Sequence, residues 1–227
     1  MTSSLFKSPP AVADPSGTRE RLLDAAGRVF AERGFAAATV REICSLAGAN
    51  VAAINYHFGD KEGLYSRVLG HALDIARDRH PINDDPGAPA EDRLRAFIGS
   101  FLMRMLDDGR PAWHGKLMAR EMVEPTKELE VIARTTMRPT FDLLLGIIAG
   151  LTGLRADGEI ARRCAFSVIG QCVMHKHCRP AIEVLYPGAR YDGEAISALA
   201  NHIHAFSLAG VRAAAARGEG TPCTVSP

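Results

Sequence analysis

The stretch that decides the fold runs from Thr39 to Lys61 and reads TVREICSLAGANVAAINYHFGDK. Thr39, followed three residues later by Glu42, forms the pattern of a capping box, which satisfies free backbone N–H groups at a helix start. Gly48 then begins a tight turn, and Asn50 is a typical N-cap residue for the next helix. The stretch therefore predicts two helices of about two turns each, joined by a short glycine-containing turn.

Longer helices are predicted on both sides of this pair. Apolar side chains with a 3.6-residue repeat indicate a helix from Thr18 to Arg33, which Gly34 is placed to end in a left-handed turn. Gly59 and Asp60 end the second helix of the pair, and a helix over residues 61–79 follows. The side chains predicted to be buried here are Leu22, Ala26, Val29, Phe30, Val40, Ile43, Cys44, Ala47, Val51, Ile54, Phe58, Leu64, Val68, Leu69 and Ala72.

The remaining chain is also predicted to be helical. Residues 81–89 form a loop by composition, and Pro139 should bend or divide its helix near Met137. No alternating run of β-branched or aromatic residues indicates a strand, so the predicted fold class is all-α. The further helices are expected over about 94–105, 113–123, 126–151, 157–177 and 192–217. The expected organisation is a flexible arm (1–17), a helix-turn-helix head of three helices (18–67), a larger helical body (68–216) and a flexible tail (217–227).

Composition limits the class of protein. With 47% apolar and 23% charged residues, the chain has the composition of an ordinary globular protein. A formal net charge of +1 means that any nucleic-acid contact comes from a small patch and not from a basic domain. No run approaches the roughly 20 apolar residues that span a bilayer. Five cysteines, an odd number, favour a reducing cytoplasm over a disulfide-stabilised secreted domain.

Once its apolar side chains are buried, the helix after Asn50 is left with a short, almost uncharged face. In a helix-turn-helix, this second helix enters the major groove of DNA. Small residues there allow a close approach to base pairs, and the Asn55 amide matches the hydrogen-bonding edge of adenine. Other members of the set are placed at the rim, where they would contact phosphates. The predicted DNA-binding residues are Thr39, Arg41, Asn50, Val51, Ala52, Ala53, Asn55, Tyr56, His57 and Lys61.

Residues 18–69 resemble the DNA-binding head of the tetracycline-repressor (TetR) family. The resemblance rests on the entry GFxxxTVREI, which begins at Gly34, and on the exit NYHFxDKExL, which begins at Asn55. It implies an α-helical homodimer that binds double-stranded operator DNA, with a body that binds a small-molecule effector. Where this chain has Asn55 the family often has an aromatic residue, which leaves the base preference open. The resemblance also implies phosphate contacts by Thr39, Arg41, Tyr56 and Lys61, and base contacts by residues 51–55 and His57.

The body resembles the CecR branch of that family. The stretches that carry this resemblance are REMVEPTKELEVIARTTMRPTFDLLLGIIAGLTG, from Arg120, and SVIGQCVMHK, from Ser167. The resemblance implies a drug-like or otherwise amphipathic effector and control of transport or resistance genes.

The helix predicted over residues 157–177 is apolar almost all round, so it needs partners on every side. One possibility is a second copy of the chain, which would pair this helix and the last one in an isologous four-helix interface. The alternative is that it forms the central helix of a monomer's core. The predicted interface residues are Phe166, Ile169, Val173, Ile203 and Phe206.

Two further sets of residues have a functional and a structural interpretation. A predicted effector pocket comprises apolar side chains with a few polar groups, although a helical core has the same pattern. Its residues are Trp113, His114, Met118, Glu121, Met122, Phe141 and Leu145. The second set has the ligand types of a zinc or copper site but lies at a helix end, where cationic histidines are favoured by the helix dipole. It comprises Cys172, His175, His177 and Cys178, and neither a metal nor another cofactor is predicted.

The sequence contains no G-x-S-x-G, P-loop or H-E-x-x-H motif, so it predicts no enzyme. We expect a cytoplasmic one-component regulator, a repressor rather than an activator, which binds a palindromic operator as a dimer and is released by an effector. The alternative is a helical small-molecule or metal-binding protein without sequence-selective DNA binding.

Overall fold

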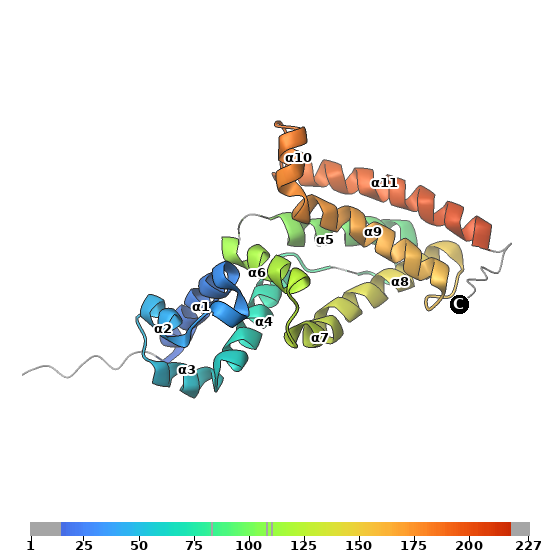
Figure 1. Ribbon diagram of the computed structural model, residues 1–227. Coiled ribbons are helices and arrows are strands. Elements are labelled where there is room, and N and C mark those ends of the chain that lie inside the picture. The colour runs from blue at the N-terminus through green and yellow to red at the C-terminus, as the bar shows by residue number, and fades with distance from the viewer. Residues whose placement is uncertain (1–14, 83, 108, 110, 219–227) are drawn as a thin grey trace, which may run out of the picture. The chain divides into compact units, whose positions relative to one another are not determined.

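The computed structural model describes residues 15–82, 84–107, 109 and 111–218, which form helices with no strand among them (Figure 1). The predicted all-α class is therefore confirmed. The chain divides between Leu69 and Gly70 into two compact units, which we call the head and the body. The helices are α1 (Pro15–Ala37), α2 (Val40–Ala47), α3 (Val51–Phe58), α4 (Lys61–Arg79), α5 (Ala90–Leu106), α6 (Ala112–Val123), α7 (Glu128–Ile132), the π-helix η1 (Ala133–Met137), α8 (Arg138–Thr152), α9 (Glu159–His177), α10 (Arg179–Leu185) and α11 (Gly193–Gly218).

The head is built on α1, whose apolar stripe is fully buried. Leu22 and Phe30 have no exposed surface, and the Phe30 ring meets the Tyr65 ring edge-on at a centroid distance of 4.8 Å. Gly34 interrupts α1 with φ 76° and ψ 169°, a positive φ that glycine adopts without a Cβ clash. The last residues of α1 thereby change direction toward the start of α2. The predicted role of Gly34 in ending the regular helix is confirmed, with an extended ψ in place of a left-handed helical one.

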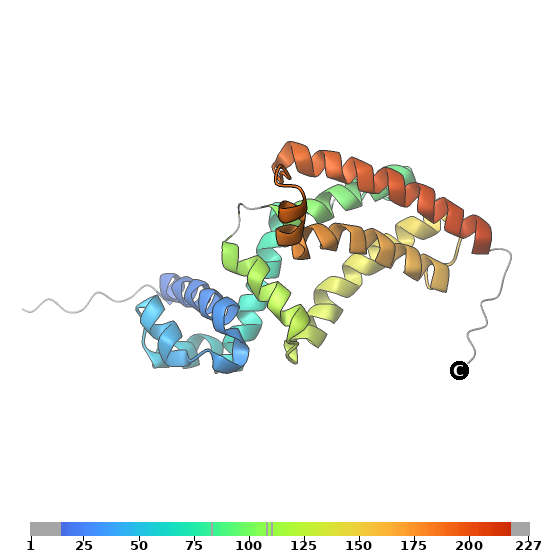
Figure 2. The same cartoon turned by 45° about the horizontal axis from the view of Figure 1, so that its top comes forward.

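The body has one apolar core between four helices. α5, α8, α9 and α11 supply it, and Figures 1 and 2 show α9 and α11 side by side with α5 behind them. Polar contacts join α11 to its neighbours: the Arg212 guanidinium bonds the Glu91 carboxylate at 2.9 Å, and the Gln171 amide donates to the Ser207 hydroxyl at 3.0 Å. The fully buried side chains of this core include Leu94, Phe97, Ile98, Leu102, Leu106, Leu144, Ile148, Ala161 and Ala165.

The predicted helix over 126–151 loses its regular α-helical pattern just before Pro139, although it stays helical from Glu128 to Thr152. The turn before Pro139, Ala133–Met137, is a π-helix, and α8 starts at Arg138 with the proline in its first turn. Proline lacks an N–H and its ring clashes with the carbonyl four residues earlier, so an added residue in the preceding turn relieves the clash. The position of the irregular turn was therefore predictable, whereas its π geometry was not.

The two ends of the chain and one short helix differ from what was expected. α1 begins at Pro15, so the predicted arm of residues 1–17 is helical at its end, and its first fourteen residues lie outside the described part. The predicted tail is helical as far as Gly218, and the rest of it lies outside the described part. The helix α10, over Arg179–Leu185, was not predicted at all. It buries no residue, so it lacks the periodic apolar stripe by which the other helices were recognised.

Candidate nucleic-acid interface

The turn between α2 and α3 has the geometry that its residues predict. Gly48 ends α2 in the left-handed conformation (φ 60°, ψ 40°), and its N–H donates back to the carbonyls of Cys44 and Ser45. The side chain of Asn50 then caps α3 by accepting a 2.9 Å hydrogen bond from the Ala53 N–H. Two short helices are thus joined by three residues, which is the helix-turn-helix arrangement.

Thr39 caps α2, and only half of the predicted capping box is observed. The Thr39 hydroxyl accepts a hydrogen bond from the Glu42 N–H at 3.2 Å. The Glu42 carboxylate, however, pairs with Arg33 Nε at 2.7 Å. The side chain that was expected to reach back to the start of α2 is thus held by α1, and this ion pair joins the two helices.

Burial fixes which face of α3 points outward. Ile54 has no exposed surface, and Phe58 is partly buried with the Arg19 guanidinium 5.9 Å from its ring centroid. The prediction that Val51 also points inward is wrong, because 48% of it is exposed. Val51 is the first residue of α3, so the apolar stripe that includes Ile54 and Phe58 is left uncovered at the start of the helix.

The outward face of α3 is small, polar and free of acidic residues. Tyr56 is 83% exposed, and Asn55 and Ala52 are exposed beside it. Ala53 and His57 are partly buried, and the His57 and Tyr56 rings lie 4.9 Å apart. Amide, hydroxyl and methyl groups of this kind complement base edges and phosphates without repelling a polyanion. The exposure of Val51 adds a methyl-bearing side chain to the same face.

The basic positions at the rim of this face have different surroundings. Arg41 is exposed, and within the described residues it has no ion pair. Lys61 instead lies against its own head: its amine donates to the Ala36 carbonyl at 3.3 Å and sits 4.7 Å from the Phe35 ring centroid. Arg41 is therefore the side chain of the two that is available to a phosphate without first breaking a contact.

The residues predicted to form an effector pocket are divided between two helices. On α6, Trp113, His114 and Glu121 are buried, and the Glu121 carboxylate accepts hydrogen bonds from the Thr126 N–H and hydroxyl, both at 2.9 Å. Met118 is partly buried and Met122 is 39% exposed. On α8, Leu145 belongs to the body core, and the partly buried Phe141 packs against it. Buried polar side chains thus occur on α6, and they also occur on α11, where His204 and Ser207 are buried.

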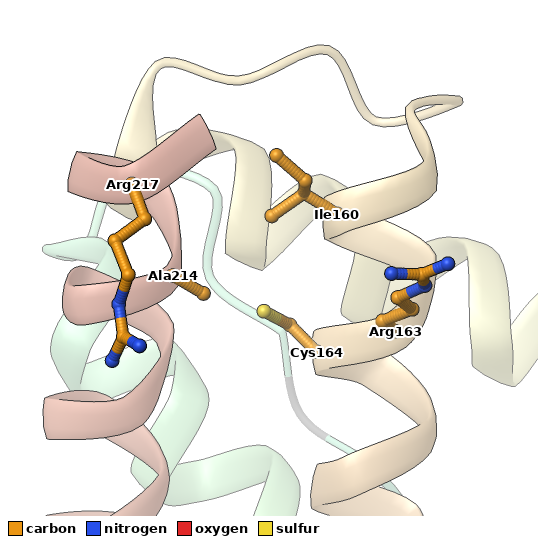
Figure 3. Close-up of a pocket in the computed structure, with 5 residues that line it drawn as sticks. All are labelled: Ile160, Arg163, Cys164, Ala214 and Arg217. Carbon is orange, nitrogen blue, oxygen red and sulfur yellow. The ribbon is translucent and has the colours of Figure 1, made fainter. Parts of the chain in front are cut away.

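A groove with other lining residues lies between α9 and α11. Its volume is about 250 Å³, and Figure 3 shows Ile160, Cys164 and Ala214 along it. Arg163 and Arg217, from facing helices, flank it. None of the predicted pocket residues lines this groove. The sequence offered no signal for it, because it arises where two helices with ordinary amphipathic patterns meet.

The outward faces of α9 and α11 expose large apolar side chains. Phe166 is 61%, Met174 55% and Phe206 66% exposed, while Ile169 and Val173 are partly buried. The Phe166 ring packs against Phe141 of α8 at a centroid distance of 4.8 Å. The remaining predicted interface residue, Ile203, is 2% exposed and lies in the body core. It points inward because it falls on the stripe of α11 that includes Ile196 and Ala200.

The cysteines and histidines at the end of α9 do not gather into a metal-ligand set: among the described residues, no three His, Cys, Asp or Glu side chains lie close enough together to hold a metal ion. Burial raises the pKa of the Cys172 thiol to about 12, so this thiol is protonated at neutral pH. His175 Nδ1 lies 3.5 Å from the Tyr191 hydroxyl, and its pKa is lowered by burial and then by His202. Cys178 is exposed.

The described helices include none that combines the length and the apolar character needed to cross a membrane.

Two family models match the chain, one in each unit. Residues 22–68 match the model of bacterial regulatory proteins of the tetR family. Residues 90–211 match the C-terminal domain of the HTH-type transcriptional dual regulator CecR.

Relatives and solved structures agree with these matches. The chain is 30% identical over 190 residues to the HTH-type transcriptional dual regulator CecR of Shigella flexneri, covering 78% of this chain and 83% of that protein. It is 35% identical over 95 residues to the HTH-type transcriptional repressor KstR2 of Mycolicibacterium smegmatis, covering 41% and 46% of the two chains.

Among solved structures, a TetR-like transcriptional regulator from Rhodococcus sp. RHA1 has a TM-score of 0.59 at 18% identity, covering 90% of this chain and 100% of that one. The structure of AibR in complex with isovaleryl coenzyme A and operator DNA has a TM-score of 0.60 at 19% identity, covering 83% and 97%. At such identities the likeness concerns the fold. With a tetR-type head and a CecR-type body, this chain belongs to the tetR family of bacterial regulatory proteins.

Proposed function

We propose that this protein is a one-component repressor that binds a palindromic operator as a homodimer and is released by a small-molecule effector. The observation that carries the proposal is the outward face of α3. Asn50 caps this helix and Ile54 is buried beneath it, whereas Asn55 and Tyr56 are exposed. The side of α3 that would contact base pairs is therefore open to solvent.

The division of roles follows from the groups that are exposed. Asn55 is proposed to read a base, with adenine as its natural partner, and the neighbouring small residues allow the backbone to approach. Arg41, Tyr56 and the N-terminal turn of α2 are proposed to contact phosphates. Lys61 joins them if its amine exchanges the Ala36 carbonyl for a phosphate oxygen.

The homodimer is supported by the outward faces of α9 and α11. Three large apolar side chains, Phe166, Met174 and Phe206, are more than half exposed on two adjacent helices of the body. Exposed apolar patches of this kind mark interaction sites, and a two-fold axis would cover both copies at once. Symmetry then requires operator half-sites about 34 Å apart, or a multiple of that spacing.

The effector is proposed to bind beside α6, where His114 and Glu121 bring polar groups into a buried helix face. The AibR structure, which contains both isovaleryl coenzyme A and operator DNA, provides a precedent within this fold. An effector that favours the DNA-incompetent spacing of the heads by about 1 to 3 kcal/mol would weaken operator binding by the same free energy.

The proposal is tested by selecting bound duplexes from a random pool, followed by titration of the enriched operator. We expect a palindrome. Arg41→Ala should weaken binding to every duplex and lower the salt slope by about one, whereas Asn55→Ala should change the preference at one base position. Arg28→Ala is the matched control, because Arg28 is already paired with Asp24 at 3.0 Å.

A small-molecule binding protein with a non-functional head is the alternative, and it predicts effector affinity without enrichment of any sequence. Failure to enrich a palindrome, or an Arg41→Ala variant with unchanged affinity and salt slope, would contradict the proposed function.

A further inference from the structure

The helix α10 ends in a run of apolar side chains that the chain itself does not cover. Val184 is 80%, Leu185 71% and Tyr186 71% exposed. In the described part of the chain, no other three consecutive large apolar residues are exposed. Exposed apolar surface of this density costs free energy in water unless a partner covers it.

The base of α10 is fixed to the body. The Arg179 guanidinium donates to the Glu183 carboxylate at 2.9 Å and lies 4.6 Å from the ring centroid of Tyr191, which follows the helix in the chain. The Tyr191 hydroxyl in turn lies 3.5 Å from His175 of α9. Both ends of the segment are thereby tied together, so its apolar tip is presented in one direction.

That direction is away from the core of the body. Figure 2 shows α10 in front of the layer formed by α9 and α11, with α5 behind it, and Figure 1 shows α10 rising from one end of the same layer. The exposed faces of α9 and α11 carry Phe166, Met174 and Phe206. Met174 lies in the last turn of α9, and α10 begins two residues after α9 ends, so a partner that covers this end of α9 also lies next to α10.

We propose that α10 is an arm that packs against the body of a second copy of this chain. The proposal rests on the proposed homodimer and continues its interface: a copy seated on α9 and α11 brings its surface alongside the arm, and the two-fold axis makes the contact reciprocal. The chemistry of the tip agrees, because residues 184–189 (VLYPGA) contain no charge and so offer nothing to a nucleic acid or an anionic surface.

The first test removes the apolar tip. In the full chain, the double variant Val184→Asp, Leu185→Asp is compared with wild type by sedimentation velocity over a concentration series. Because each dimer has two arms, we expect the dimer dissociation constant to rise on the order of 100-fold. Val123→Asp is the matched control: Val123 is 79% exposed on α6 and should leave the dissociation constant unchanged. Circular dichroism shows whether each variant keeps its helices.

The outcomes separate the arm from the dimer. An unchanged dissociation constant in the double variant overturns the arm and leaves the dimer intact, whereas a wild-type protein that is monomeric throughout the series overturns both. An equal weakening by Val123→Asp also overturns the arm, because the effect would then follow from added charge alone.

A second test locates the contact without disturbing it. Tyr186 is replaced by photoreactive benzoylphenylalanine, and isotopically heavy and light chains are mixed, allowed to exchange and irradiated. We expect cross-linked peptides that join one heavy to one light chain. Cross-links confined to a single chain would overturn the proposal.

Discussion

The outward face of α3 in the head and the outward faces of α9 and α11 in the body are equally open to solvent, but their chemistry is opposite. α3 exposes Asn55 and Tyr56 among small residues, whereas α9 and α11 expose Phe166 and Phe206. Exposed polar groups form hydrogen bonds with water when no partner is bound, whereas exposed aromatic rings gain free energy when a partner removes them from water. The outward face of α3 therefore suits reversible binding of a polar partner, and the outward faces of α9 and α11 suit a stable apolar contact.

The two units also differ in how their helices are terminated. In the head, the starts of α2 and α3 are closed by the side chains of Thr39 and Asn50. In the body, α5, α6 and α9 follow Pro89, Pro111 and Gly158, none of which forms a side-chain cap. α11 is an exception in the body, because the Asp192 carboxylate before it accepts a hydrogen bond from the Ala195 N–H at 3.0 Å. Side-chain caps therefore set the starts of α2 and α3, whereas α5, α6 and α9 begin without one.

The largest expected effect is on the apolar faces of α9 and α11, and it is a loss of dimer stability. Phe206→Asp places a charge in the proposed α9–α11 interface of both copies, so we expect the dimer to lose about 3 to 6 kcal/mol and to dissociate at micromolar concentration. Light scattering measures the mass, and Phe206→Leu is the control that should remain dimeric. A dimeric Phe206→Asp protein would show that the ring lies outside the interface.

A smaller effect sharpens the comparison within α3. Ile54→Ala should destabilise the head by about 2 to 5 kcal/mol, because Ile54 is fully buried and truncation leaves a cavity. Val51→Ala on the same helix removes a side chain that is 48% exposed and should cost well under half as much. Hydrogen exchange of peptides from residues 40–58 measures both. Similar losses of protection in the two variants would contradict the assignment of the outward face.

The smallest expected effect concerns the polar contacts of Asp107 in the body, which we call the Asp107 junction. The hydrogen bond from His80, 2.8 Å away, and then the Gly109 N–H hold the pKa of Asp107 below its ordinary value of 3.8. Because the folded state binds this proton less tightly than the unfolded chain, the stabilisation is complete above about pH 5 and is lost as pH falls through the lowered pKa.

Asp107→Asn should therefore show a shallower loss of thermal stability than wild type on acidification from about pH 5 to about pH 3. Asp157→Asn is the control: its partner Arg155 is 83% exposed, so solvent screens the pair and the wild-type pH profile should be kept. Parallel melting curves for wild type and Asp107→Asn would count against the Asp107 junction.

Much of the head was predictable because the residues that start and end its helices act on nearby backbone groups. Thr39, Gly48 and Asn50 each act on backbone groups within four residues, and the observed bounds of α3 and α4 are those that the caps indicated. The prediction for Val51 failed because apolar character alone does not decide burial at the first turn of a two-turn helix. In the body, Pro139 marked the irregular turn before α8, while α10 had no periodic signal to read.

The amino-acid sequence by itself determined the helical class, the helix-turn-helix and the identity of the groups on α3, because periodicity and capping are set by neighbouring residues. Only the tertiary structure decided that Ile203 belongs to the core while Phe206 does not, that Lys61 lies on its own head, and that a groove opens between Cys164 and Ala214. The physical reason is that burial depends on which helix arrives from elsewhere in the chain, and no short stretch of residues carries that information.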